Sequence, residues 1–207
     1  IEETCQLVRY ALLQGGMQPS CASYVDPNGG GNLVWAVGFF FELSRRTAED
    51  IKVLQLLLGI LVDEAGADIN QRDSKTRLPL MHAVRSGCLL AVQCMLSKGA
   101  NVHLRDQEGW TPLLCCCMND VTDQGTVDRV ACLQALLDAG ADVNSQTLAG
   151  GSALMAAVTH NDLPTALIET LLAAGAEGNL RVKNGTSPMS HLQSLLGNDT
   201  HAARHAG

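Results

Sequence analysis

One short phrase, Gly-Ala followed by a polar residue, recurs four times in this 207-residue chain and constrains its fold more than any other feature. The four glycines are spaced 33, 41 and 35 residues apart, and an apolar segment precedes each of them. About ten residues after each copy comes a second phrase of the Thr-Pro-Leu type. Periods of this length are typical of chains built by stacking one small structural unit. The copies begin at Gly66, Gly99, Gly140 and Gly175.

Each unit predicts a turn, a short helix, a reversal and a second, leucine-rich helix. The first helix is expected to begin at a Thr or Ser cap with Pro in its first turn, and the second to end at Gly. Two such helices cannot bury their apolar faces alone, whereas stacking on neighbouring pairs completes a continuous core. Only 3% of the residues are aromatic, which favours helices packed through small residues over a β-sandwich or barrel.

The phrases at 76–80, 109–113, 150–154 and 185–189 carry a resemblance to a known family. With them the chain resembles the ankyrin-repeat family, whose unit of about 33 residues is a turn plus two helices with a Thr-Pro-Leu-His phrase. The resemblance implies one all-α domain, a solenoid of helix-turn-helix units with β-turn fingers, which is a binding scaffold rather than an enzyme. The predicted units are 1–25 (partial), 26–72, 73–105, 106–146, 147–181 and 182–207 (partial repeat and tail).

The chain departs from the family at the histidine of that phrase. Met81, Leu114, Met155 and Ser190 stand in its place, so we expect a less polar stack with fewer hydrogen bonds between neighbouring turns. Both end units are partial, so either they cap the stack or the parent chain continues beyond them. We expect the chain to be part of a larger chain or complex.

The resemblance implies that a partner protein binds along the fingers and the exposed positions of the first helices. An exposed tryptophan is a frequent binding hot spot, but Trp110 at a finger is equally compatible with a cover over the neighbouring finger. The predicted partner-binding residues are Lys75, Arg77, Arg85, Ser86, Gln107, Glu108, Trp110, Met118, Asn119, His160 and Lys183.

Insertions between the first and second helices define an alternative site. Compared with a unit of 33 residues, units 26–72, 106–146 and 147–181 are 14, 8 and 2 residues longer. The extra residues fall around 39–50, 121–128 and 162–164, on the edge opposite the fingers. The phenylalanines at 39–41 either pack between longer helices or anchor a partner, and the second case favours a structural subunit of a larger assembly. This alternative edge comprises Phe39, Phe40, Phe41, Asp123 and Asp128.

Charge and cysteine usage exclude several classes of protein. With 14 Lys and Arg against 21 Asp and Glu, the chain lacks the basic excess of a nucleic-acid binder. Three of the eight cysteines are consecutive, Cys115 to Cys117, which favours reduced thiols and an intracellular protein, cytoplasmic or nuclear. No apolar run approaches the ~20 residues of a bilayer span, so no membrane span is expected.

The sequence carries no recognisable catalytic or cofactor motif. Phosphate-binding loops, zinc-protease and paired-cysteine motifs and dinucleotide fingerprints are missing. His201 and His205 share a helical spacing, but two ligands without a third make a poor metal site. We therefore predict a non-enzymatic protein-interaction module without metal or cofactor; the alternative is a subunit built permanently into an assembly.

Overall fold

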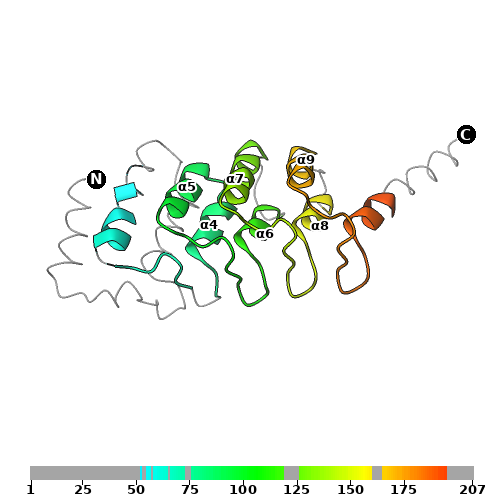
Figure 1. The fold of residues 1–207 in the computed structure, drawn as a ribbon, viewed down its shortest axis with the longest axis horizontal. Helices are drawn as coiled ribbons and strands as arrows, with labels where there is room; N and C mark the ends of the chain where they lie inside the picture. The colour runs from blue at the N-terminus through cyan, green and yellow to red at the C-terminus, as the bar shows by residue number, and fades with distance from the viewer. Residues whose placement is uncertain are drawn as a thin grey trace, which may run out of the picture.

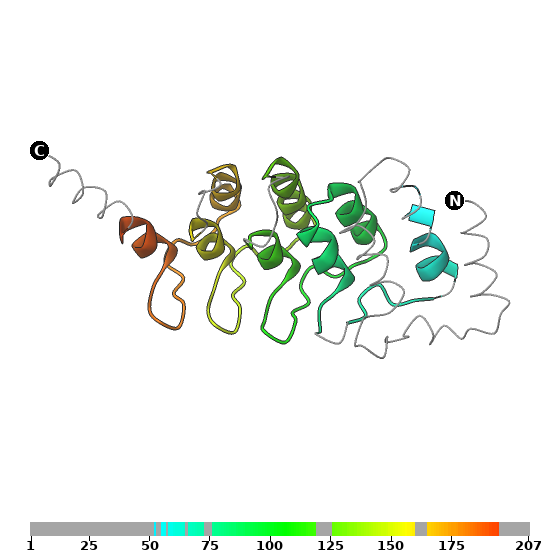
Figure 2. The ribbon, with the colours of Figure 1, turned by 180° about the vertical axis from the view of Figure 1, so that it is seen from behind.

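The computed structural model describes residues 52, 55–56, 58–64, 66–72, 76–118, 126–159 and 165–194. They form two rows of helices, with hairpin loops extending from one edge, as Figures 1 and 2 show from opposite sides. The first row packs α4 on α6 and α6 on α8, and the second packs α5 on α7 and α7 on α9. The bounds are η2 (Gly59–Glu64, a π-helical turn), α4 (Pro79–Arg85), α5 (Leu89–Ser97), α6 (Pro112–Cys116), α7 (Thr126–Asp138), α8 (Ala153–Val158) and α9 (Thr165–Ala173).

This arrangement confirms the predicted all-α solenoid. Units 73–105, 106–146 and 147–181 each contribute one helix to each row, because α4 packs on α5, α6 on α7 and α8 on α9. Residues 188–194 are also helical, and extended pairing in the described ranges is limited to one bridge between Gln146 and Ser152. The larger core cluster of buried side chains extends from Leu58, just before η2, to α9, with Leu136 and Leu171 fully buried in it.

Three of the four first helices in the described ranges begin at the predicted Thr or Ser cap. One of these caps is Ser187, which accepts from the Ser190 N–H at 3.3 Å before the helical residues 188–194. Thr111 and Ser152 cap α6 and α8, accepting hydrogen bonds from the backbone N–H groups of Leu114 (3.3 Å) and Met155 (3.2 Å). Helix α4 differs, because its N-cap is Leu78, which provides no side-chain hydrogen bond. Pro79 starts α4 at a position where a helix needs no N–H donor.

The predicted insertion at 121–128 is helical in its last three residues. Helix α7 begins at Thr126 and runs for 13 residues, against 9 for α5 and 9 for α9. The last three residues of the expected insertion, Asp128 among them, therefore lengthen the second helix, which corrects the prediction. The insertions at 39–50 and 162–164, together with residues 121–125, lie outside the described residues.

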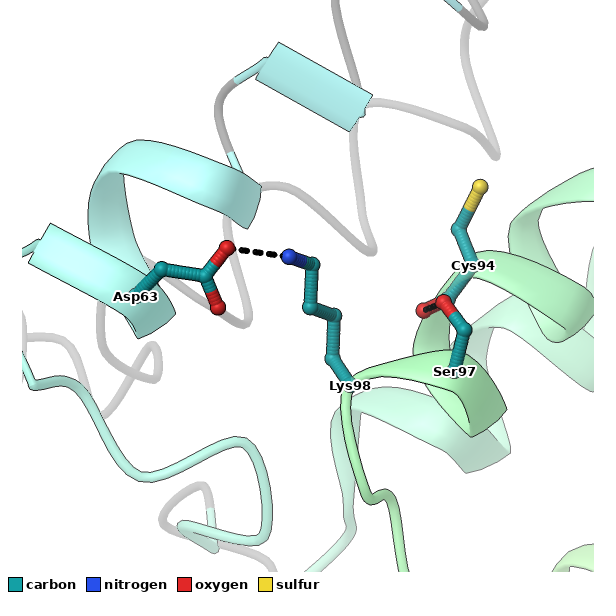
Figure 3. A network of polar contacts seen from close by, with 4 residues as sticks. All are labelled: Asp63, Cys94, Ser97 and Lys98. Carbon is teal, nitrogen blue, oxygen red and sulfur yellow. Dashed lines mark hydrogen bonds and ion pairs between the residues drawn. The ribbon is translucent and has the colours of Figure 1, made fainter.

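Polar contacts tie the second helices together at the start of the described chain. The ammonium group of Lys98, at the C-terminal end of α5, forms an ion pair with the carboxylate of Asp63 in η2 (Figure 3). Beside it, the Ser97 hydroxyl donates to the Cys94 carbonyl at 2.8 Å. A cation at a helix C-terminus is favourable, but an exposed pair of this kind contributes only about 0.2–1 kcal/mol.

A ladder of side chains joins the bases of successive fingers. Arg72 donates to the carbonyl of Thr76 (3.1 Å) in its own finger and to that of Arg105 in the next. Arg105 repeats the pattern with the carbonyls of Gly109 (3.2 Å) and Gln146. Gln146 then donates to Gly150 (2.7 Å) and Arg181 (3.4 Å). The expectation of a less polar stack is therefore wrong at the finger bases.

A second ladder joins the turns that follow the second helices. The Asn144 amide donates to the Gly175 carbonyl at 3.1 Å, and its oxygen accepts from the Glu177 N–H at 2.9 Å. Asn70 bridges to the turn at 99–101 in the same way, at 3.3 and 2.7 Å. His103 occupies the equivalent position between these two, and the described residues show no such side-chain bridge there.

Candidate functional site

A pocket of about 200 Å³ lies between unit 73–105 and unit 106–146. Six of the eleven predicted partner-binding residues line it, contributed by two neighbouring fingers and first helices. One wall comes from the first unit and the other from the second, so stacking the two repeats creates the pocket. The first wall consists of Arg77, Met81, His82 and Arg85, and the second of Asp106, Gln107, Glu108, Trp110, Cys115 and Met118.

Trp110 is half-buried and packs across the repeat boundary. Its ring lies against the small cluster formed by Leu78, Met81 and Cys115. Its indole N–H donates to a Glu108 carboxylate oxygen at 3.2 Å, which holds the ring in one orientation. Trp110 therefore covers part of the preceding unit while it also lines the pocket, and its role as a hot spot stays a prediction.

The acidic wall is fixed by the turn of its own finger. One Asp106 oxygen accepts hydrogen bonds from the backbone N–H groups of Glu108 and Trp110, both at 2.9 Å. The N–H of Asp106 donates to the Trp110 carbonyl at 3.0 Å, which closes the hairpin. This turn presents Glu108 and Trp110 on a rigid base.

The opposite wall carries two half-buried arginines, Arg77 beside the finger and Arg85 at the end of α4. Both guanidinium groups lie close enough to the Cys115 thiol to lower its pKa, but burial and the Asp106 carboxylate outweigh them and raise it to about 12. Burial also raises the pKa of Cys117 to about 12. Both thiols therefore stay protonated at neutral pH and are poor nucleophiles, and of the two only Cys115 lines the pocket.

The structure corrects one predicted site residue and leaves others untested. Ser86 is only 4% exposed, and its hydroxyl donates to the Ala83 carbonyl at 2.7 Å, so it is not on the binding surface. Lys183 is exposed, but it lies in the last finger, away from the pocket. Lys75, Phe39, Phe40, Phe41, Asn119, Asp123, His160, His201 and His205 lie outside the described residues.

Sequence reasoning missed an exposed apolar residue at a finger tip. Leu148 is 66% exposed, and its N–H donates to the Glu108 carbonyl at 2.9 Å, so it adjoins the finger that forms the second wall. The signal was present in the sequence, because the equivalent finger positions hold the polar residues Gln107 and Lys183.

Metal sites and membrane spans are two other features that the described residues could contain. These residues include no group of three or more His, Cys, Asp or Glu side chains placed to hold a metal ion. Within the same ranges, no helix has the length and apolar character needed to cross a membrane. The six described cysteines are free thiols, and Cys5 and Cys21 lie outside this part of the chain.

Two rows of helices with hairpin fingers on one edge, and a pocket between neighbouring units, define a helical-repeat scaffold. Residues 46–147 match the family model for ankyrin repeats in three copies. These residues carry ankyrin repeats, and the fold is the ankyrin-repeat solenoid. Ankyrin repeats form a non-catalytic module that generally mediates protein–protein interaction.

The relatives agree with this assignment. The chain is 32% identical over 136 residues to the B-cell lymphoma 3 protein homolog of Mus musculus, which covers 64% of this chain and 28% of that protein. It is 33% identical over 138 residues to the human ankyrin repeat and SOCS box protein 6, covering 64% of this chain and 31% of that protein. The chain thus matches less than a third of the length of either relative.

A solved ankyrin repeat domain from Acinetobacter baumannii has the same fold. It superimposes with a TM-score of 0.70 over 93% of this chain and 87% of the other, at 23% sequence identity. At this identity the likeness concerns the fold alone.

Proposed function

We propose that this chain is a protein-interaction module that anchors its partner in the pocket between Arg77 and Trp110. The observation that carries the proposal is the convergence of six predicted binding residues on one pocket at a repeat boundary. Tryptophan and arginine dominate the binding energy of protein interfaces, and both residue types line this pocket.

The size of the pocket supports a macromolecular partner. Small-molecule sites usually enclose about 300–1,000 Å³. About 200 Å³ accommodates one or two side chains of a partner segment, which would rest on Trp110 and Met118. Further contacts would then run along the exposed fingers on either side, where Gln107 and Leu148 stand.

The two walls carry opposite charge, which supports selectivity. Arg77 and Arg85 lie on one side, and Asp106 and Glu108 on the other. A partner must match both signs in the correct orientation, because opposing like charges across an interface costs several kcal/mol. Shape and charge together therefore restrict how a partner segment can enter.

The first experiment locates the partner. A photo-reactive amino acid placed at Gln107, on the rim of the pocket, should crosslink to a partner from the native source. The same amino acid at Glu169 in α9, which is exposed and far from the pocket, serves as the control. The protein identified by mass spectrometry is then purified for measurement.

The second experiment tests the surface. Trp110→Ala and Arg85→Glu should each weaken binding of the purified partner at least tenfold, which is about 1.4 kcal/mol. Lys52→Glu reverses an exposed charge outside the pocket and should leave the affinity unchanged. Wild-type affinity in both pocket variants, with folding intact by circular dichroism, rejects the proposal.

The alternative, a permanent structural subunit, predicts the opposite ranking. Residues 121–125 belong to the predicted insertion edge, so deleting them should weaken binding less than Trp110→Ala does if the pocket is the binding site. A larger loss from this deletion would move the binding site to the insertion edge.

We further propose that the protein acts inside the cell, in the cytoplasm or nucleus, and within a longer chain or a complex. Six free, buried thiols support a reducing compartment. Microscopy of the tagged native protein tests the location, and a signal confined to the secretory pathway would contradict it.

A further inference from the structure

At one position of the finger, the unit 73–105 beside the pocket differs from the other units. Gly109, Gly150 and Gly185 occupy it in three fingers, with φ of +84°, +85° and +86°. In the first described finger the same position holds Thr76, with φ of +58°. Thr76 is the one non-glycine residue with positive φ in the described ranges, and a β-branched residue in this conformation is a true outlier.

The glycine fingers pack too closely to accept a side chain. A Cβ added to Gly109 would lie 2.8 Å from the backbone nitrogen of Leu148, and one added to Gly150 would lie 2.9 Å from the Arg181 carbonyl oxygen. Backbone hydrogen bonds hold these pairs, from Leu148 N–H to the Glu108 carbonyl at 2.9 Å and from Lys183 N–H to the Ala149 carbonyl at 3.0 Å.

At Thr76 a side-chain hydroxyl accepts a hydrogen bond from the neighbouring finger. The N–H of Gln107, which is equivalent to that of Leu148, donates to the Thr76 hydroxyl at 2.7 Å. The atom in contact is therefore one covalent bond farther from the backbone than a Cβ. Real Cβ atoms essentially never lie within 3.0 Å of such a neighbour, so the Thr76 side chain needs more space between its finger and the next than the glycines do.

The widened junction is the one that holds the pocket. Thr76 lies next to Arg77 in the sequence, and its hydroxyl accepts from Gln107. Arg77 and Gln107 belong to opposite walls of the pocket. We propose that Thr76 is a positioning residue, a wedge that holds the two fingers apart and keeps the pocket open. The role of this opening in binding rests on the proposed function, whereas the wedge itself can be tested without a partner.

The variants follow from the geometry. Thr76→Gly removes the wedge and restores the residue found in the other three fingers, so the gap should close around a backbone hydrogen bond. Thr76→Ser keeps both the Cβ and the hydroxyl, so it should preserve the opening. Thr76→Ala keeps the Cβ but removes the acceptor for the Gln107 N–H.

Trp110 fluorescence reports on the opening. In a Trp35→Phe background Trp110 is the only tryptophan of the chain. Thr76→Gly should lower the acrylamide quenching constant of Trp110 at least twofold, and Thr76→Ser should leave it at the wild-type value. Unchanged quenching in Thr76→Gly overturns the proposal, and so does unfolding of that variant, because glycine is accommodated at this position in three fingers.

Hydrogen exchange provides the second readout. The Gln107 amide should exchange at least tenfold faster in Thr76→Ala, which lacks an acceptor, and remain protected in Thr76→Ser and Thr76→Gly. Equal protection in all variants would show that the hydroxyl does not hold this amide and would overturn the wedge.

Binding of the purified partner separates the two proposals. Thr76→Gly should weaken it at least tenfold. If quenching falls while the affinity is unchanged, the wedge is supported and the pocket is not the binding site.

Discussion

Two glycines with the same backbone conformation should respond very differently to alanine. Gly109 and Gly140 have φ of +84° and +85°. A Cβ at Gly140 meets nothing within 4 Å, whereas one at Gly109 would lie 2.8 Å from the Leu148 nitrogen and 3.2 Å from its Cγ. The comparison therefore isolates the close approach of two fingers from the backbone strain that both positions share.

The magnitude follows from adding these effects. An L-residue in the left-handed region costs roughly 1–2 kcal/mol, which both variants bear. Gly109→Ala must also displace a neighbouring backbone, and overpacking of this kind costs typically about 1–3 kcal/mol. The lower entropy of the unfolded alanine chain is common to both variants and cancels. We expect Gly109→Ala to destabilise by about 1–3 kcal/mol more than Gly140→Ala.

Urea denaturation followed by circular dichroism measures both variants, with the midpoint and the slope fitted separately. A repeat array can lose cooperativity, so a change in slope is read as partial unfolding of the stack. Equal losses of stability in the two variants would refute the argument that the fingers at Gly109 lie too close together for a Cβ. The glycine fingers would then no longer serve as the comparison for Thr76.

The remaining predictions concern the core, the ladder and the thiols. Leu136→Ala should destabilise by ~2–5 kcal/mol in denaturant melts because Leu136 is fully buried, and a loss below ~1 kcal/mol would place it outside the inter-repeat core. His103→Asn should stabilise the folded chain by ~1 kcal/mol, because the new asparagine would make the bridge between turns that Asn144 makes one repeat later. An unchanged melting temperature would contradict this prediction. Burial raises the pKa of Cys115 and Cys117 to about 12, so above pH 9 the unfolded chain loses protons that the folded chain keeps. Stability should therefore fall as the pH rises from about 9 towards 12, with a shallower fall in Cys115→Ala.

The helices and their core were predictable because stacking imposes a period on the sequence. Leucines such as Leu136 and Leu171 recur where the second helices meet, and their burial follows from that spacing. The binding surface is less predictable, as Ser86 shows. Its repeat position indicates exposure, but α4 is only 7 residues long and the chain reverses at Ser86, which turns its hydroxyl back onto Ala83.

The ladders were not predictable from the family phrase. Its missing histidine suggested fewer hydrogen bonds, yet Arg72, Arg105 and Gln146 bind backbone carbonyls, which every repeat supplies whatever its side chains. A long polar side chain anywhere near a finger base can therefore replace the histidine. The relevant signal was the recurrence of Arg or Gln at one repeat position, just before each finger.

The boundary between units 73–105 and 106–146 differs from the next one in two ways. Its fingers are linked through the hydroxyl of Thr76, a residue that is glycine in the other described fingers, and His103 replaces the asparagine that would bridge its turns. In a solenoid whose stability is a sum of nearest-neighbour interfaces, substitutions at one boundary weaken that boundary without unfolding the others. The pocket lies at this boundary. The open pocket and the missing side-chain bridge between the turns therefore both follow from the residues at this boundary, Thr76 and His103. His103→Asn should strengthen the contact between the turns while the two fingers stay apart.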